Sequence, residues 1–305
     1  MKWLLRAGAI LLIAAAAWII SVNAEKWFEQ IGRFNWQLDW FLICTSVILL
    51  GLSYYIIPAG WILLSHAAGS EIEPKELRAA WFMSQLGRYI PGKVWLFAGR
   101  AAFLKSRGLA GFRATSVPFL ELLYTAAGAG LTAIIPVIIS SKAVFSHSGL
   151  KYAVLAAGIS LLVIPFLTPI QKRLYRLKYG RIPGKLPLPG LIDSSKLLIF
   201  YSGLWWFRGL ALFLLLKGFG VTDISLLLCC AAAPLAWLAG YIVFLVPGGI
   251  GVREAAAVAL VAPSDAAGPV LAVIVGQRLI LSTLEVVLAL VSTRKLKLFG
   301  EGKPL

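Results

Sequence analysis

Residues 246–254 read VPGGIGVRE and interrupt an apolar stretch that runs from Ser225 to Ala262. Proline removes a backbone donor and glycine weakens a helix, so this segment cannot continue as an unbroken membrane helix. In hydrocarbon the freed backbone groups are costly unless they face protein or a wet cavity. The break therefore predicts a half-helix that begins near Ile250, whose free N–H groups and dipole favour an anion.

The composition around this break is that of a membrane protein. Of the 305 residues, 60% are hydrophobic and 14% charged, against about 25% charged in soluble domains, and the mean hydropathy is +0.86. We expect an all-α polytopic membrane protein that forms a single transmembrane domain over residues 1–305. The first apolar run also resembles a signal peptide, but we favour a retained helix. Runs long enough to span a ~30 Å hydrocarbon core lie at 3–22, 40–64, 117–139, 152–170, 197–216 and 270–291.

The net charge of +16 comes from cations that cluster between the apolar runs. Cytoplasmic loops of membrane proteins collect Lys and Arg, so the basic loops 65–116 and 171–196 and the C-terminal tail are predicted to be cytoplasmic. This distribution argues against nucleic acid as a partner. We expect a multi-pass protein of the cytoplasmic (inner) membrane with both termini in the cytoplasm. Residues 225–262 must then start and end outside, as a re-entrant hairpin or as two closely packed spans.

A second break, YIPGKVW at 89–95, lies between apolar patches in the basic segment. We expect residues 74–105 to form a hairpin that enters and leaves from the cytoplasm, the alternative being an interfacial amphipathic helix. The chain then has six full spans plus two re-entrant or broken hairpins, up to eight spans if these are counted. Its halves, roughly 1–145 and 146–305, form an inverted-topology repeat of the kind found in secondary transporters.

Charged residues near the breaks and inside the spans are the candidate site. Each ionisable residue at the centre of a helix costs ~2.5–3.5 kcal/mol, so Glu121, Arg208, Arg278 and Glu285 must face a wet cavity or one another. Glu121 and Arg278 each follow one of the two breaks by about thirty residues. For Arg88 we favour a cation that reaches the membrane interface. The predicted substrate-binding residues are Pro91, Gly92, Lys93, Arg100, Glu121, Arg208, Pro247, Gly248, Gly249, Gly251, Arg253, Glu254 and Arg278.

Motifs for catalysis, metals and cofactors are not apparent. The three cysteines lie in apolar runs without CxxC spacing, and the only histidines are His66 and His147, so we expect no metal site, no catalytic residues and no cofactor. The phosphate-binding pattern GxxxxGK[ST] is also missing, which argues against direct use of ATP.

The segments LGRYIPGKVWLFAGR (86–100) and VPGGIGVREAA (246–256), with Glu121 and Arg278 in the spans that follow them, resemble the flippase-like membrane protein family. That family includes the transmembrane region of the lysyl-phosphatidylglycerol synthases, which resembles a translocase of aminoacylated lipid. The chain is similar to a stand-alone member without the soluble transferase domain. The resemblance implies lipid transport rather than lipid synthesis, and it leaves the cargo open.

We therefore expect a translocase for an anionic membrane phospholipid or a polyprenyl-phosphate-linked lipid, with the head group held at the half-helix tips near the midplane. The alternative is an integral-membrane lipid-modifying transferase or phosphatase, and a weaker one is a binding or regulatory partner without transport.

Overall fold

A computed structural model describes residues 24–90, 94–109, 111–139, 173, 177, 189–243, 246–263 and 265–300. Within these residues all regular structure is helical and no strand occurs, which confirms the all-α prediction. The expected spans at 3–22 and 152–170 lie outside the described residues, as does most of the loop at 171–196.

Four described helical stretches are long and apolar enough to cross a membrane. The first, Trp40–Ala67, consists of α2 (Trp40–Ile56) and α3 (Pro58–Ala67), with Pro58 as the first residue of α3. The others are α6 (Gly111–Ile139), α10 (Leu191–Gly218) and the Ala267–Thr293 part of α13 (Ala267–Gly300). These stretches coincide with four of the predicted spans, so the chain is a membrane-embedded helical protein.

The helices extend beyond the predicted apolar runs. Helix α10 begins six residues before the predicted start at Leu197, and α13 continues through residues 294–300, where a separate basic tail was expected. Hydropathy locates the part of a helix that lies in hydrocarbon, whereas the backbone hydrogen bonds continue into the polar region without interruption. The helices are therefore longer than the apolar runs from which they were predicted.

Each sequence break separates two short helices. Around the first lie α4 (Pro74–Gln85), the 3₁₀ turn η1 (Leu86–Tyr89) and α5 (Val94–Ser106). Around the second lie α11 (Leu226–Ile242), the 3₁₀ turn η3 (Pro247–Gly249) and α12 (Val252–Val261). With 10 to 17 residues apiece, none of the four helices reaches the ~20 residues of a full span.

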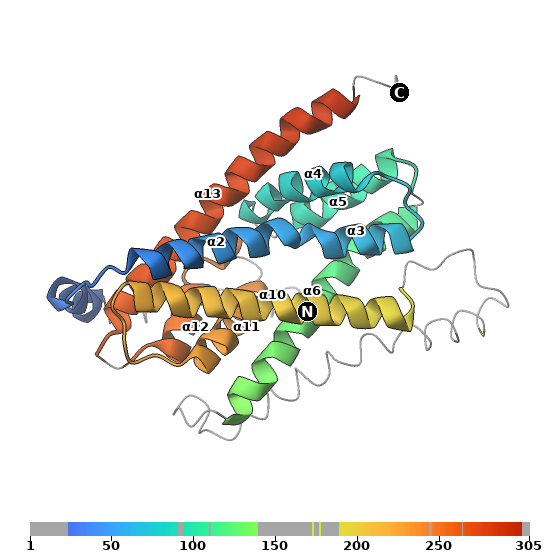
Figure 1. The fold of residues 1–305 in the computed structure, drawn as a ribbon. Helices are drawn as coiled ribbons and strands as arrows, with labels where there is room; N and C mark the ends of the chain where they lie inside the picture. The colour runs from blue at the N-terminus through green and yellow to red at the C-terminus, as the bar shows by residue number, and fades with distance from the viewer. Residues whose placement is uncertain are drawn as a thin grey trace, which may run out of the picture.

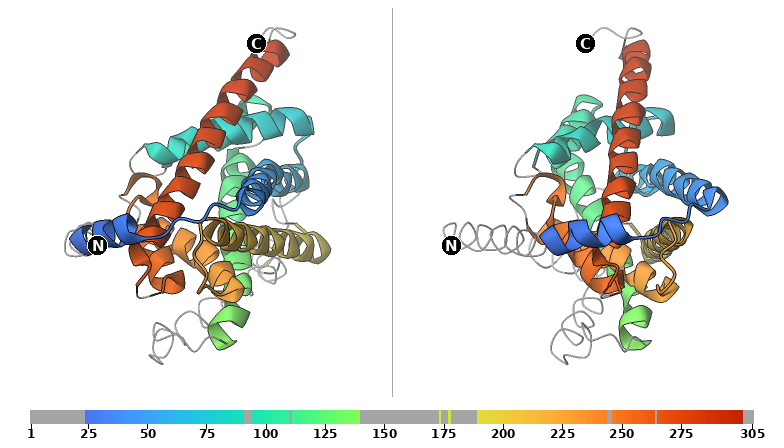
Figure 2. Two further views of the ribbon diagram at one scale, coloured as in Figure 1. Left: turned by 60° about the vertical axis from the view of Figure 1, so that its left-hand side comes forward. Right: turned by 90° about the vertical axis from the view of Figure 1, so that its left-hand side faces the viewer.

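The long helices form a frame for these two pairs. Helices α2 and α3 run alongside α10, and α6 crosses them steeply (Figure 1). Helix α4 packs on α13 and α5 on α6, while α11 packs on α6 and α10 and α12 packs on α13. In both views of Figure 2 the α4–α5 pair lies above the α11–α12 pair, and η1 contacts η3. The two breaks therefore meet inside the molecule.

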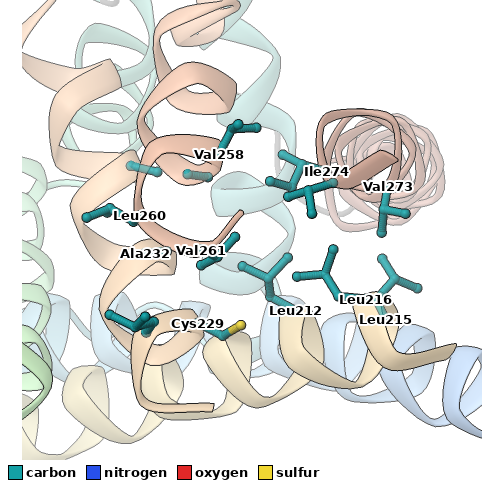
Figure 3. Packing of buried hydrophobic residues seen from close by; sticks show 14 of the residues in the cluster. Leu212, Leu215, Leu216, Cys229, Ala232, Val258, Leu260, Val261, Val273 and Ile274 are labelled. Carbon is teal, nitrogen blue, oxygen red and sulfur yellow. The ribbon is translucent and has the colours of Figure 1, made fainter. Parts of the chain in front are cut away.

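Two apolar clusters hold this arrangement. One lies around α10, α11, α12 and α13, where Leu212 and Leu216 of α10 face Val273 and Ile274 of α13 (Figure 3). The other joins α3, α4, α6 and α10 and contains the fully buried Trp61. The first cluster thus packs the α11–α12 pair, and the second the α4–α5 pair, against the long helices.

Glycines allow the helices to approach each other closely. A Cβ on Gly209 of α10 would lie 2.4 Å from the Cα of Cys230 in α11, and one on Gly128 of α6 would lie 2.8 Å from the backbone nitrogen of Ser202. Small residues at such crossings are typical of membrane helices, because van der Waals packing is what holds them together.

Gly209→Ala is expected to destabilise the protein, because the new methyl group meets backbone that cannot rotate away. Overpacking of this kind costs about 1–3 kcal/mol. Gly203→Ala is the matched control, since the same helix has nothing within 4 Å of a Cβ there, and alanine favours a helix by about 1 kcal/mol over glycine. Unfolding in detergent measures both, and equal stability of the two variants would contradict the close α10–α11 crossing.

Candidate functional site

The second break is built from glycines in conformations that other residues rarely adopt. Gly248, Gly249 and Gly251 have φ of 62°, 69° and 83°, in the region that only glycine enters without strain. Helix α12 begins at Val252, and no side chain caps its first turn. The half-helix predicted to begin near Ile250 therefore starts two residues later. For Pro247 the structure describes the backbone only.

Arg278 of α13 holds this break in place. Its Nη2 donates to the carbonyl oxygen of Gly248 at 2.9 Å, and its Nη1 pairs with Oε1 of Glu254 in the first turn of α12. Glu254 is buried, and its Oε2 has no partner among the described residues. Arg278 therefore positions the break and the start of α12 together.

Arg253 crosses α11 at a glycine. A Cβ on Gly240 would lie 2.3 Å from the Cγ of Arg253 and 3.5 Å from the Cα of Gly249. Only a residue without a side chain lets the arginine stem pass here. Within the described part of the chain, no carboxylate lies within 4.0 Å of the Arg253 guanidinium.

The first break meets the second through Tyr89. Its ring carbons lie 3.7–3.8 Å from the position that a Cβ on Gly248 would take, and its hydroxyl donates to Oε2 of Glu285 at 2.8 Å and lies 3.1 Å from Ser282 Oγ. The predicted site residues Pro91, Gly92 and Lys93 lie outside the described residues.

Arg88 does not reach for the membrane interface, and that interpretation is wrong. Its Nη1 pairs with Oε1 of Glu285 at 2.6 Å, and its Nη2 bonds to Gln85. The reason is tertiary: α4 packs on α13, which places a buried carboxylate beside η1. The pair connects the first break to the last span.

Arg100 and Glu121 form the most deeply buried ion pair in the described structure, with side chains 3% and 6% exposed. Trp81 Nε1 donates to Oε1 of Glu121 at 2.6 Å, and the Nε of Arg100 donates to Ser84 Oγ at 2.8 Å. The Arg100 guanidinium also lies 4.8 Å from the centre of the Trp81 ring. Both carboxylate oxygens and two of the guanidinium nitrogens thus have partners, as a buried pair needs.

Arg208 of α10 has only weak partners among the described residues. Its Nε lies 3.5 Å from Ser53 Oγ, and its guanidinium lies 5.2 Å from the centre of the Trp205 ring. As with Arg253, no described carboxylate lies within 4.0 Å.

One cavity of about 180 Å³ connects these residues. Both helix pairs and all four long helical stretches contribute to its wall. The predicted residues on its wall are Arg100, Glu121, Arg208, Gly248, Arg253 and Arg278, and the prediction missed Tyr54, Gln85, Arg88, Tyr89, Trp205, Trp237, Tyr241 and Glu285 as site residues. Of the missed residues, two had a usable signal in the sequence: Arg88, one helical turn before Pro91, and Glu285, a charge inside the last span that was expected to face a wet cavity or another charge.

The cavity is strongly cationic in an apolar surrounding. Five arginines line it against two glutamates, and Glu254 lies just behind as the partner of Arg278. In the described residues no group of three or more His, Cys, Asp or Glu could hold a metal ion. The arrangement can bind and shield negative charge within the helical core.

The chain matches no protein-family model and no curated protein.

Proposed function

We propose that the chain is a translocase that moves an anionic lipid, a phospholipid or a polyprenyl-phosphate-linked lipid, across the cytoplasmic membrane. The observation that carries the proposal is a cavity between apolar helices in which Arg208 and Arg253 have no described carboxylate partner. An arginine in hydrocarbon costs several kcal/mol, so such residues mark pathways for ions or substrates. The resemblance to the flippase-like family also favours transport of a lipid.

An inverted repeat is part of this proposal. Helix α5 packs on the span that follows it, α6, as α12 packs on α13, and α4 packs on α13 as α11 packs on α6. The equivalent helices α2 and α10 pack on each other. Such an exchange of partners supports two halves, 1–145 and 146–305, that are related by an axis in the membrane plane.

The ion pairs follow the same plan with their signs exchanged. In the first half the hairpin provides the cation, Arg100, and the following span the anion, Glu121. In the second half the hairpin provides the anion, Glu254, and the following span the cation, Arg278. Each pair ties the second arm of a hairpin to the next span.

The transport cycle that fits this plan has two steps. The phosphate enters the cavity and pairs with Arg208 and Arg253, while its tails stay among the lipids. One half then rocks against the other around the contact between η1 and η3, exposing the cavity to the other side. Both hairpins are re-entrant in this proposal, and both termini are cytoplasmic.

Arg253→Gln is expected to slow lipid movement about tenfold in proteoliposomes, because a hydrogen bond to a charged group contributes about 1.5–3 kcal/mol. The assay follows labelled phosphatidylglycerol and labelled polyprenyl phosphate from one leaflet to the other. Arg33→Gln is the control, since Arg33 pairs with Glu29 in an exposed position.

The proposal fails if the wild type accelerates neither lipid. Chemical analysis of the lipids after the assay tests the enzymatic alternative. A dephosphorylated or transferred product, formed by the wild type and not by Arg253→Gln, would favour a lipid-modifying enzyme over a translocase.

A further inference from the structure

The charge in the cavity is not balanced. Arg88, Arg100 and Arg278 each pair with a glutamate, which leaves the charges of Arg208 and Arg253 uncompensated among the described residues. Lys, His and Asp are not found on the described cavity wall. The cavity therefore carries an uncompensated charge of about +2 from these two arginines.

The two uncompensated arginines line the same cavity. Arg208 comes from α10 and Arg253 from α12, and both line the cavity. Arg88 and Arg278 line the same cavity wall. Cations held near one another in a low-dielectric region repel strongly, so the arrangement favours a ligand that supplies two negative charges over a ligand that supplies one.

A buried donor lies at the same cavity. Tyr54 of α2 is 2% exposed, and its hydroxyl has no hydrogen-bond partner among the described residues. A buried hydroxyl without a partner is costly. The hydroxyl can donate to a phosphate oxygen, so it gains a partner when the cavity is occupied. Ser53, beside it in the sequence, contacts Arg208.

The size of the cavity limits the head group. A cavity of about 180 Å³ is smaller than the ~300–1,000 Å³ of pockets that enclose drug-sized ligands. It has room for a phosphate and a few neighbouring atoms. A bulky glycan head group would have to stay outside.

We propose that the cavity is specific for a terminal phosphate monoester, held as a dianion by Arg208 and Arg253 with the Tyr54 hydroxyl as a third donor. This inference rests on the proposed function and names its substrate class. A monoester carries about −1.5 to −2 charges at pH 7, with a second pKa near 6, and so matches the uncompensated charge. A phosphodiester carries only one.

Binding of short-chain lipids to the purified protein in detergent tests this specificity. The probes are dioctanoyl phosphatidic acid, a monoester, and dioctanoyl phosphatidylglycerol, a diester with the same tails. The monoester is expected to bind at least about tenfold more tightly at pH 7.5, and to lose this advantage near pH 5, where it takes up a proton and becomes a monoanion. Arg208→Gln and Arg253→Gln should each remove the preference, and Arg33→Gln should retain it.

Three results would overturn the inference. Equal affinity for the two lipids in the wild type rules out monoester specificity, and if both lipids are still translocated, the proposed function stands. Absence of binding and of translocation for both, with the arginine variants indistinguishable from Arg33→Gln, removes the proposed function as well. Inorganic phosphate that displaces phosphatidic acid at equal concentration would show that free phosphate, rather than a lipid, is the ligand.

Discussion

Replacing Glu121 with glutamine is expected to lower the free energy of unfolding by about 3–5 kcal/mol, the usual cost of leaving one member of a buried ion pair alone. Arg100 is 3% exposed and has no other carboxylate within 4.0 Å in the described chain. The glutamine keeps the shape and can still accept from Trp81 Nε1. The loss therefore reports the charge rather than the packing. Unfolding by SDS titration in mixed micelles measures it.

The double variant Arg100→Met/Glu121→Leu tests whether the lost stability comes from the unpaired charge. Apolar residues of similar size can replace a complete buried pair at little cost, so the double variant should regain most of the stability lost by Glu121→Gln. Glu29→Gln, which breaks the exposed pair with Arg33, is the control. Surface pairs contribute only ~0–1 kcal/mol to the free energy of unfolding. If Glu121→Gln has the same free energy of unfolding as the wild type, the Arg100–Glu121 pair does not stabilise the packing of α5 on α6.

Arg278→Ala is expected to reduce lipid translocation at least about 100-fold, since displacement of a binding group by roughly 1 Å can have an effect of that size. Both terminal nitrogens of Arg278 are engaged, one by Gly248 and one by Glu254. Without these two interactions the backbone at Gly248 is no longer held against α13. Arg253, in the first turn of α12, is then displaced together with this backbone. The flux assay in proteoliposomes gives the measurement.

Combining Arg278→Ala with Glu254→Gln shows which part of the effect is structural. The single variant leaves the buried Glu254 carboxylate without its cation, and the second substitution removes this orphan charge. Stability should recover in the double variant, whereas translocation should stay low because the carbonyl of Gly248 still lacks its donor. A normal rate of translocation in Arg278→Ala would contradict the positioning role.

Prediction from sequence succeeded for features that depend on local composition. The long apolar runs were sufficient to place α2–α3, α6, α10 and α13, because hydrocarbon demands a certain length of apolar chain. The break at Gly248 was equally visible, since proline and glycine act on their own backbone. Arg208 and Arg278 could be singled out because charge inside a span is expensive.

The partners of these charges could not be predicted. Arg88 pairs with Glu285, 197 residues away, and Arg278 with Glu254, and both pairs depend on how α4 and α12 pack on α13. The sequence alone did not indicate that Tyr54 and Tyr89 belong to the cavity, because tyrosine is also common at membrane interfaces.

By itself the sequence determined that this is a helical membrane protein, where its long helices run and where two of its helices break, because each of these follows from the solvation of nearby residues. Only the tertiary structure decided that the two breaks touch, that three arginines are neutralised by distant glutamates, and that Arg208 and Arg253 are not neutralised by any described carboxylate. The physical reason is that charge balance in a low-dielectric interior depends on distances of a few ångströms between side chains, which helix packing sets.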